Sequence, residues 1–101
     1  MSRDEFEREA LSAIEIERTS ASLSLSQRGL DLGPVELSRQ GEGDLYDSEL
    51  RLYALRDGQV VDALEVHVWR QGRPTATIEQ LRLWFRSELD TLLSWSAKRP
   101  S

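Results

Sequence analysis

The sequence predicts an α+β fold, in which two helices pack on a small single-layer antiparallel sheet built around a β-hairpin. Two observations predict it. Near each end of the chain, apolar residues recur at the three- and four-residue steps of a helix, and on either side of Asp57-Gly58 apolar residues alternate with polar ones as in a strand. With 101 residues, 39% of them hydrophobic, the chain can bury one modest core. We therefore expect one domain over residues 1–101, with 98–101 as a frayed tail.

The first helix is expected over about residues 3–18. Ser2 and Glu5 have the spacing of a capping box, and acidic residues in the first turn favour a helix N-terminus. A stripe that shares one helix face follows at steps of three and four and comprises Phe6, Ala10, Ala13, Ile14 and Glu17.

Residues 19–27 are open to two interpretations. Ala21, Leu23 and Leu25 alternate with polar residues, as in a strand, while Ala21 and Leu25 also continue the four-residue step of a helix. We take the strand as the first interpretation and the longer helix as its alternative. The glycine-containing stretch 27–44 predicts turns and connections, with one short strand over residues 35–38.

The hairpin is expected at about 45–56 and 60–71, because both runs alternate apolar with polar residues. A two-residue turn at Asp57-Gly58 sets Leu64 against Arg51, so that apolar and charged side chains share each face of the hairpin. A three-residue loop that includes Gln59 keeps the apolar side chains on one face and the charged ones on the other. One face is then apolar and the other charge-paired, with the pairs Leu52–Leu64, Leu50–Val66, Arg51–Glu65 and Glu49–His67.

The second helix is expected over about residues 77–95. Pro74 ends the preceding strand, and Thr77 with Gln80 forms a second capping-box spacing. The stripe that should face the core comprises Ile78, Leu81, Phe85, Leu89 and Leu92.

Charge is divided unevenly along the chain, whose formal total is −5. Residues 1–50 carry 12 acidic and 5 basic side chains, or −7, while residues 51–101 carry 6 acidic and 8 basic, or +2. A pI of about 4.9 with scattered arginines argues against nucleic-acid binding.

No apolar run approaches the ~20 residues of a membrane span, and the charged start does not resemble a secretory signal. We therefore expect a cytoplasmic protein that binds neither nucleic acid nor membrane.

Few residues offer catalytic or cofactor chemistry. The chain has no cysteine and one histidine, which excludes thiolate nucleophiles and multi-histidine metal sites within one chain. Asp44, Asp47 and Glu49 form an acidic cluster, but they lack the spacing of a calcium loop. We expect no catalytic residue, no metal and no cofactor. His67 is predicted to pair with Glu49 near Arg51, and these three are the candidates for a ligand pocket.

The aromatic residues are the candidates for an interface. Trp84 and Trp95 are eleven residues apart and share a helix face rotated away from the apolar stripe. Trp69 and Tyr53 are placed on the polar face of the hairpin. Aromatic side chains outside the core indicate either a second layer of the fold or a surface that meets a partner.

The sequence therefore favours a protein that acts by non-catalytic contact with a protein partner. That partner is either a second copy, giving a homodimer, or a larger protein for which this chain is an inhibitor, immunity or chaperone-like subunit. The alternative is a small-molecule-binding protein or minor enzyme with a pocket between sheet and helices near His67 and Tyr53.

Overall fold

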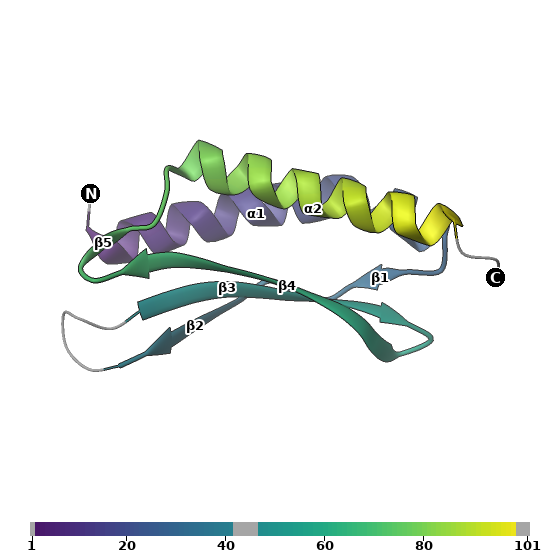
Figure 1. Cartoon of the computed structure of the whole chain (residues 1–101), viewed down its shortest axis with the longest axis horizontal. Coiled ribbons are helices and arrows are strands. Elements are labelled where there is room, and N and C mark those ends of the chain that lie inside the picture. The colour runs from purple at the N-terminus through teal and green to yellow at the C-terminus, as the bar shows by residue number, and fades with distance from the viewer. Residues whose placement is uncertain (1, 42–46, 99–101) are drawn as a thin grey trace.

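Two helices lie along one face of a curled, five-stranded antiparallel sheet, as the sequence predicts (Figure 1). The structure is a computed structural model that describes residues 2–41 and 47–98, with side chains up to residue 95. Both helices run in the same direction, from left to right in Figure 1. In chain order the elements are α1 (Arg3–Ser26), β1 (Asp31–Leu32), β2 (Glu36–Gln40), β3 (Asp47–Arg56), β4 (Gln59–Arg70), β5 (Arg73–Pro74) and α2 (Ile78–Lys98).

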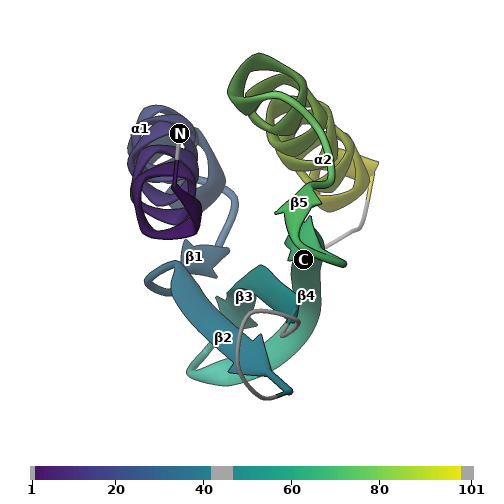
Figure 2. The same ribbon diagram turned by 90° about the vertical axis from the view of Figure 1, so that its left-hand side faces the viewer.

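The sheet is an antiparallel arrangement with β3 at its centre. β4 pairs with one edge of β3, while β1 and β2 pair with different parts of its other edge. Seen end-on, the sheet curls beneath the two helices, which stand side by side above it (Figure 2). The core fills the space between these layers and includes Phe6, Ile14, Leu52, Val68 and Phe85.

Helix α1 continues through residues 19–26, so the strand interpretation of that segment is wrong and its alternative is confirmed. Leu25 explains the difference, because its side chain is 0% exposed and lies on the same face as Ile14 and Ala21. Burial of this face outweighs the weak helix propensity of the serines and Thr19, whose side chains line the outside.

The end of α1 is a Schellman motif. Leu30 N–H donates to the Leu25 carbonyl at 2.9 Å, and Gly29 N–H donates to the Ser26 carbonyl at 3.0 Å. Gly29 adopts a φ of +81°, which glycine tolerates without the steric cost of a side chain. Leu25 and Leu30 are both fully buried, which supplies the hydrophobic contact that accompanies this motif.

The predicted hairpin register is confirmed over its centre, but the predicted loop is wrong. Leu52 opposes Leu64 and Arg51 opposes Glu65, whereas Arg56 opposes Gln59 across a two-residue turn. Asp57 and Gly58 have φ values of 53° and 80°, the backbone that such a hairpin turn requires. A β-bulge between Ala54 and Leu55 changes the register by one residue. The hairpin therefore has a two-residue turn and still keeps its apolar and charged side chains on opposite faces.

A second bulge moves Trp69 from its predicted place on the polar face into the core. The register shifts between Ser48, which opposes Trp69, and Glu49, which opposes His67. Val68 is the extra residue, and its side chain and that of Trp69 are both buried, at 0% and 8% exposed. The Trp69 ring packs against Phe6 of α1 with centroids 5.9 Å apart.

Helix α2 begins as predicted and ends slightly later than predicted. Thr77 Oγ1 accepts from Gln80 N–H at 3.0 Å, and Gln80 Oε1 accepts from Thr77 N–H at 2.9 Å, which completes the capping box. Lys98 is the last helical residue, and the rest of the predicted tail lies outside the described residues. The predicted stripe packs on the core, with Leu81, Phe85, Leu89 and Leu92 buried and Ile78 half-buried.

Candidate functional site

The predicted charge-paired face of the sheet exists and centres on Arg51. Its guanidinium lies 2.8 Å from a Glu49 oxygen and 3.0 Å from a Glu65 oxygen. A hydrogen bond to the Tyr53 hydroxyl, together with the charges of the two glutamates, raises the pKa of Arg51. Because two carboxylates already neutralise this cation, the cluster retains little positive charge with which to attract an anionic ligand.

His67 is an exposed residue at the margin of this cluster. It opposes Glu49 in the sheet, as predicted, and its carbonyl accepts a hydrogen bond from the Thr75 hydroxyl. In the described part of the chain no three histidine or acidic side chains are arranged to hold a metal ion. Of the acidic cluster noted in the sequence, Asp44 lies outside the described residues.

The two tryptophans of α2 differ in their surroundings. Trp84 is half-buried beside the core, with its ring centroid 6.3 Å from that of Phe85. Trp95 is 36% exposed, and the Arg56 guanidinium lies over its ring at 5.8 Å from the centroid. Trp95 thus lies beside Arg56, at the end of the β3–β4 hairpin.

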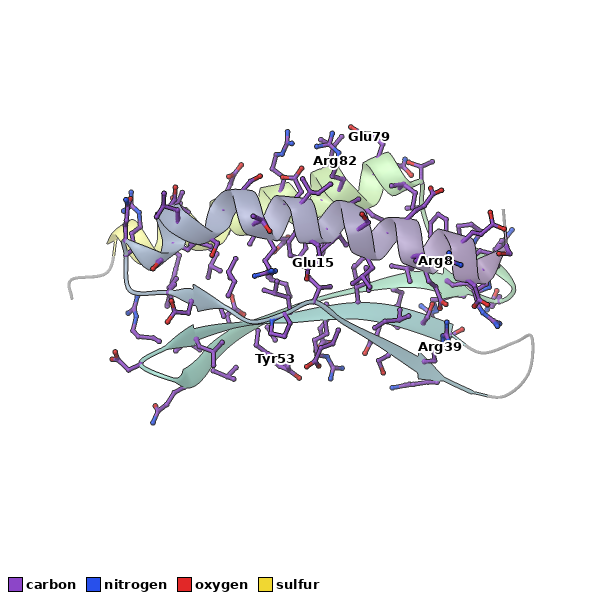
Figure 3. The ribbon with its side chains drawn as sticks, turned by 180° about the vertical axis from the view of Figure 1, so that it is seen from behind. Arg8, Glu15, Arg39, Tyr53, Glu79 and Arg82 are labelled. Carbon is purple, nitrogen blue, oxygen red and sulfur yellow. The ribbon has the colours of Figure 1, made fainter. Side chains whose placement is uncertain are left out.

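The charged side chains in the second half of α1 turn towards the rest of the protein. Glu17 is 7% exposed and accepts hydrogen bonds from Arg82 and Arg86 of α2, each at 2.8 Å. The hydrogen bond from Arg86, and then that from Arg82, outweigh burial and lower the pKa of Glu17. Arg82 also pairs with Glu79 on α2, where both side chains are labelled in Figure 3.

Two further carboxylates join α1 to the strand layer. Glu15 points towards the sheet (Figure 3), where it accepts from Val35 N–H at 3.1 Å and pairs with Arg18 on its own helix. Glu7 is 1% exposed and pairs with Arg39 of β2. Burial opposes ionisation of Glu7, but the hydrogen bond and charge of Arg39 outweigh it and lower the pKa of that carboxyl.

From Ser12 onwards, the outward face of α1 is correspondingly free of charge. Across the described span 12–27, every exposed residue is uncharged, and the charged residues are half-buried or buried. Two large apolar side chains lie on this face: Ile16 is 62% exposed and Leu23 is 70% exposed. We call this surface the outer stripe of α1; it comprises Ser12, Ile16, Thr19, Ser20 and Leu23.

A groove between the two helices adjoins the outer stripe of α1. Its volume is about 360 Å³, and Ser20 belongs to both surfaces. From α1 it presents Glu17 and three small side chains, while α2 contributes both apolar and charged ones. The groove is lined by Glu17, Ser20, Ala21, Ser24, Arg86, Leu89, Asp90 and Leu93.

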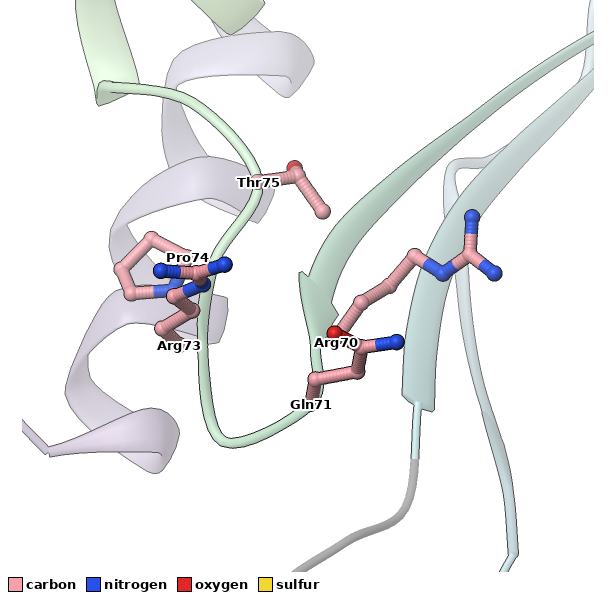
Figure 4. Close-up of a pocket in the computed structure, with 5 residues that line it drawn as sticks. All are labelled: Arg70, Gln71, Arg73, Pro74 and Thr75. Carbon is pink, nitrogen blue, oxygen red and sulfur yellow. The ribbon is translucent and has the colours of Figure 1, made fainter.

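A larger hollow, of about 560 Å³, lies at the turn between β4 and β5 (Figure 4). Two arginines line it, but their guanidinium groups point to opposite sides of the turn, and Arg70 pairs with Asp47 at 3.6 Å. Because Arg70 and Arg73 do not converge, this hollow does not form a built anion site.

Comparison with protein-family models, with curated proteins and with solved structures found no match to this chain. Neither helix in the described residues has the length and apolar character needed to cross a membrane. The assignment of a candidate surface therefore depends on the residues themselves.

The sequence prediction missed Ile16 and Leu23, although one signal for them is present. The two residues are seven apart, which places them on one line of a helix that opposes the face of Ile14 and Leu25. Interpreting residues 19–27 as a strand conceals this relation, because it separates Leu23 from the helix that carries Ile16.

Proposed function

We propose that the protein acts by non-catalytic contact with another protein, through the outer stripe of α1 and the adjoining groove. The observation that carries the proposal is the reversed charge pattern of α1 between residues 12 and 27. A helix on the surface of a monomeric domain ordinarily presents charge to water and apolar residues to the core. Here Glu17 is buried while Leu23 is 70% exposed, a pattern typical of a helix with a second partner.

The shape of this region suits a helical or flat apolar partner. Ile16 and Leu23 supply two anchors that are two helical turns apart, and small serines beside them permit close approach. Trp95, the exposed aromatic candidate on α2, lies beside Arg56 at the end of the β3–β4 hairpin and is not part of this surface. A cytoplasmic location belongs to the same proposal.

The ligand-binding alternative near His67 and Tyr53 gains no support from these contacts. Arg51 is paired with two glutamates, and His67 lies exposed at the margin of that paired cluster.

Site-specific photocrosslinking in cells that natively produce the protein tests the proposal. A photoreactive phenylalanine analogue is placed at Leu23 and, as a matched control, at the exposed Leu83 on α2. We expect a discrete protein adduct from position 23, lost when Ile16→Glu is added, and none from position 83. Equal adducts from both positions, or none from either, would contradict the proposal.

A further inference from the structure

We infer that the occupant of the outer stripe of α1 is a second copy of this chain, with the two α1 helices packed antiparallel about a two-fold axis between Thr19 and Ser20. This inference rests on the proposed function and names its partner.

The first argument is electrostatic. Each chain carries a formal charge of −5, so two copies repel one another unless they meet where charge is absent or complementary. The outer stripe of α1 meets that condition over more than three helical turns. The surroundings of the exposed Leu83 on α2 do not, because Glu79, four residues before it, and Asp90, seven residues after it, are both exposed and charged.

The second argument is the spacing of the two large side chains. An axis between Thr19 and Ser20 lies midway between Ile16 and Leu23. Antiparallel pairing therefore sets Ile16 of each copy against Leu23 of the other, so that both anchors are covered by a single symmetric contact. Because Thr19 and Ser20 are small, the helix axes can approach closely at the centre of that contact.

The ends of the stripe select the antiparallel orientation. The exposed Glu9 lies on the same helix face, three residues before the stripe begins at Ser12. Parallel pairing sets Glu9 of one copy against Glu9 of the other, whereas antiparallel pairing places the two glutamates at opposite ends of the contact. One pair of helices buries less surface than a large obligate interface does, so we expect a reversible dimer.

Sedimentation velocity on the purified chain, over concentrations from about 1 µM to 1 mM, tests the inference. We expect a reversible shift from the 11.6 kDa chain to a species of twice that mass. Leu23→Glu places an unpaired carboxylate against Ile16 of the other copy and should weaken association at least about tenfold, while Leu83→Glu should leave it unchanged.

The absence of cysteine allows a covalent test of the axis position. Thr19→Cys should form an intermolecular disulfide on mild oxidation faster than Ser87→Cys, an exposed control on the far side of α2. A chain that stays monomeric at 1 mM, or equal disulfide rates at both positions, would overturn the inference. If photocrosslinking at position 23 then still captures a different protein, self-pairing fails while the proposed function stands.

Discussion

The carboxylate of Glu17 on α1 accepts hydrogen bonds from the Arg86 guanidinium of α2 at 2.8 and 3.1 Å. Glu17 is 7% exposed, so this pair, together with Arg82, is the principal polar connection between the two helices. The helices run parallel and their dipoles repel weakly, which makes a charge-assisted contact between them valuable. The same connection turns the charge of α1 inward and leaves the outer stripe of α1 uncharged.

Replacing this carboxylate should loosen the helix pair. Glu17→Gln is expected to lower the free energy of unfolding by about 1–3 kcal/mol, because a buried acceptor loses its charge-assisted bonds. Urea denaturation followed by far-UV circular dichroism measures this. Adding Arg86→Gln should cost less in the Glu17→Gln background than in the wild type. Equal costs in both backgrounds would show that the two side chains are not coupled.

Acid should weaken the fold through the same carboxylates. The folded-state pKa values of Glu7 and Glu17 lie below their ordinary value of 4.5. The unfolded chain therefore binds protons more readily, and the stability from these pairs, present above that value, is lost as pH falls through the lowered pKa. We expect the unfolding free energy to be steady from pH 7 to about pH 5 and to fall below about pH 4.

The Glu17→Gln variant checks the assignment of this acid sensitivity. Because Gln cannot titrate, the decline of its unfolding free energy between about pH 5 and pH 3 should be shallower than in the wild type. Denaturant titrations of both proteins at matched pH values measure the two slopes. Identical slopes would assign the sensitivity to other groups.

Two leucines in the last turns of α1 discriminate directly between helix and strand for residues 19–26. Leu25→Ala should cost about 2–4 kcal/mol, because its side chain is fully buried. Leu23→Ala should change stability by less than about 0.5 kcal/mol, because Leu23 is 70% exposed. In a strand the two side chains point to one face, and their substitutions would cost similar amounts. Similar costs would therefore contradict the helix.

Gly29 should be required at the end of α1 for its backbone conformation. At a φ of +81°, Gly29→Ala places a side chain in the left-handed region and should cost about 1 kcal/mol. Gly33→Ala is the matched control, since its added Cβ meets neighbours no closer than 3.5 Å and its φ is ordinary. Thermal denaturation measures both. A larger loss at Gly33 than at Gly29 would contradict the Schellman termination.

Local sequence patterns sufficed for the elements whose stabilising contacts are themselves local. The capping box of Thr77 and Gln80 and the stripe through Phe85 predicted α2, and alternation predicted the opposition of Leu52 and Leu64. The two bulges were not predictable, because an extra residue in one strand leaves each run's alternation intact on either side. Trp69 was misplaced for that reason.

The candidate surface was harder to predict than the fold. Its recognition requires that residues 19–26 be helical, and their serines have weak helix propensity. Burial of Leu25 against the assembled core decides the conformation, and that is a tertiary contact. The pattern of Leu25, Gly29 and Leu30 was the local signal for the longer helix, since it matches a Schellman termination.

The most direct measurement of the central claim is a dilution series of the ¹⁵N-labelled protein, followed through its backbone amide resonances. It reports which surface meets a partner copy without altering any residue. We predict concentration-dependent shifts concentrated in residues 12–28, with Thr19 and Ser20 near their centre and the amides of the outer sheet face around Arg51 unchanged. Shifts centred on the outer sheet face or on the end of the β3–β4 hairpin, with residues 12–28 unchanged, would contradict the account.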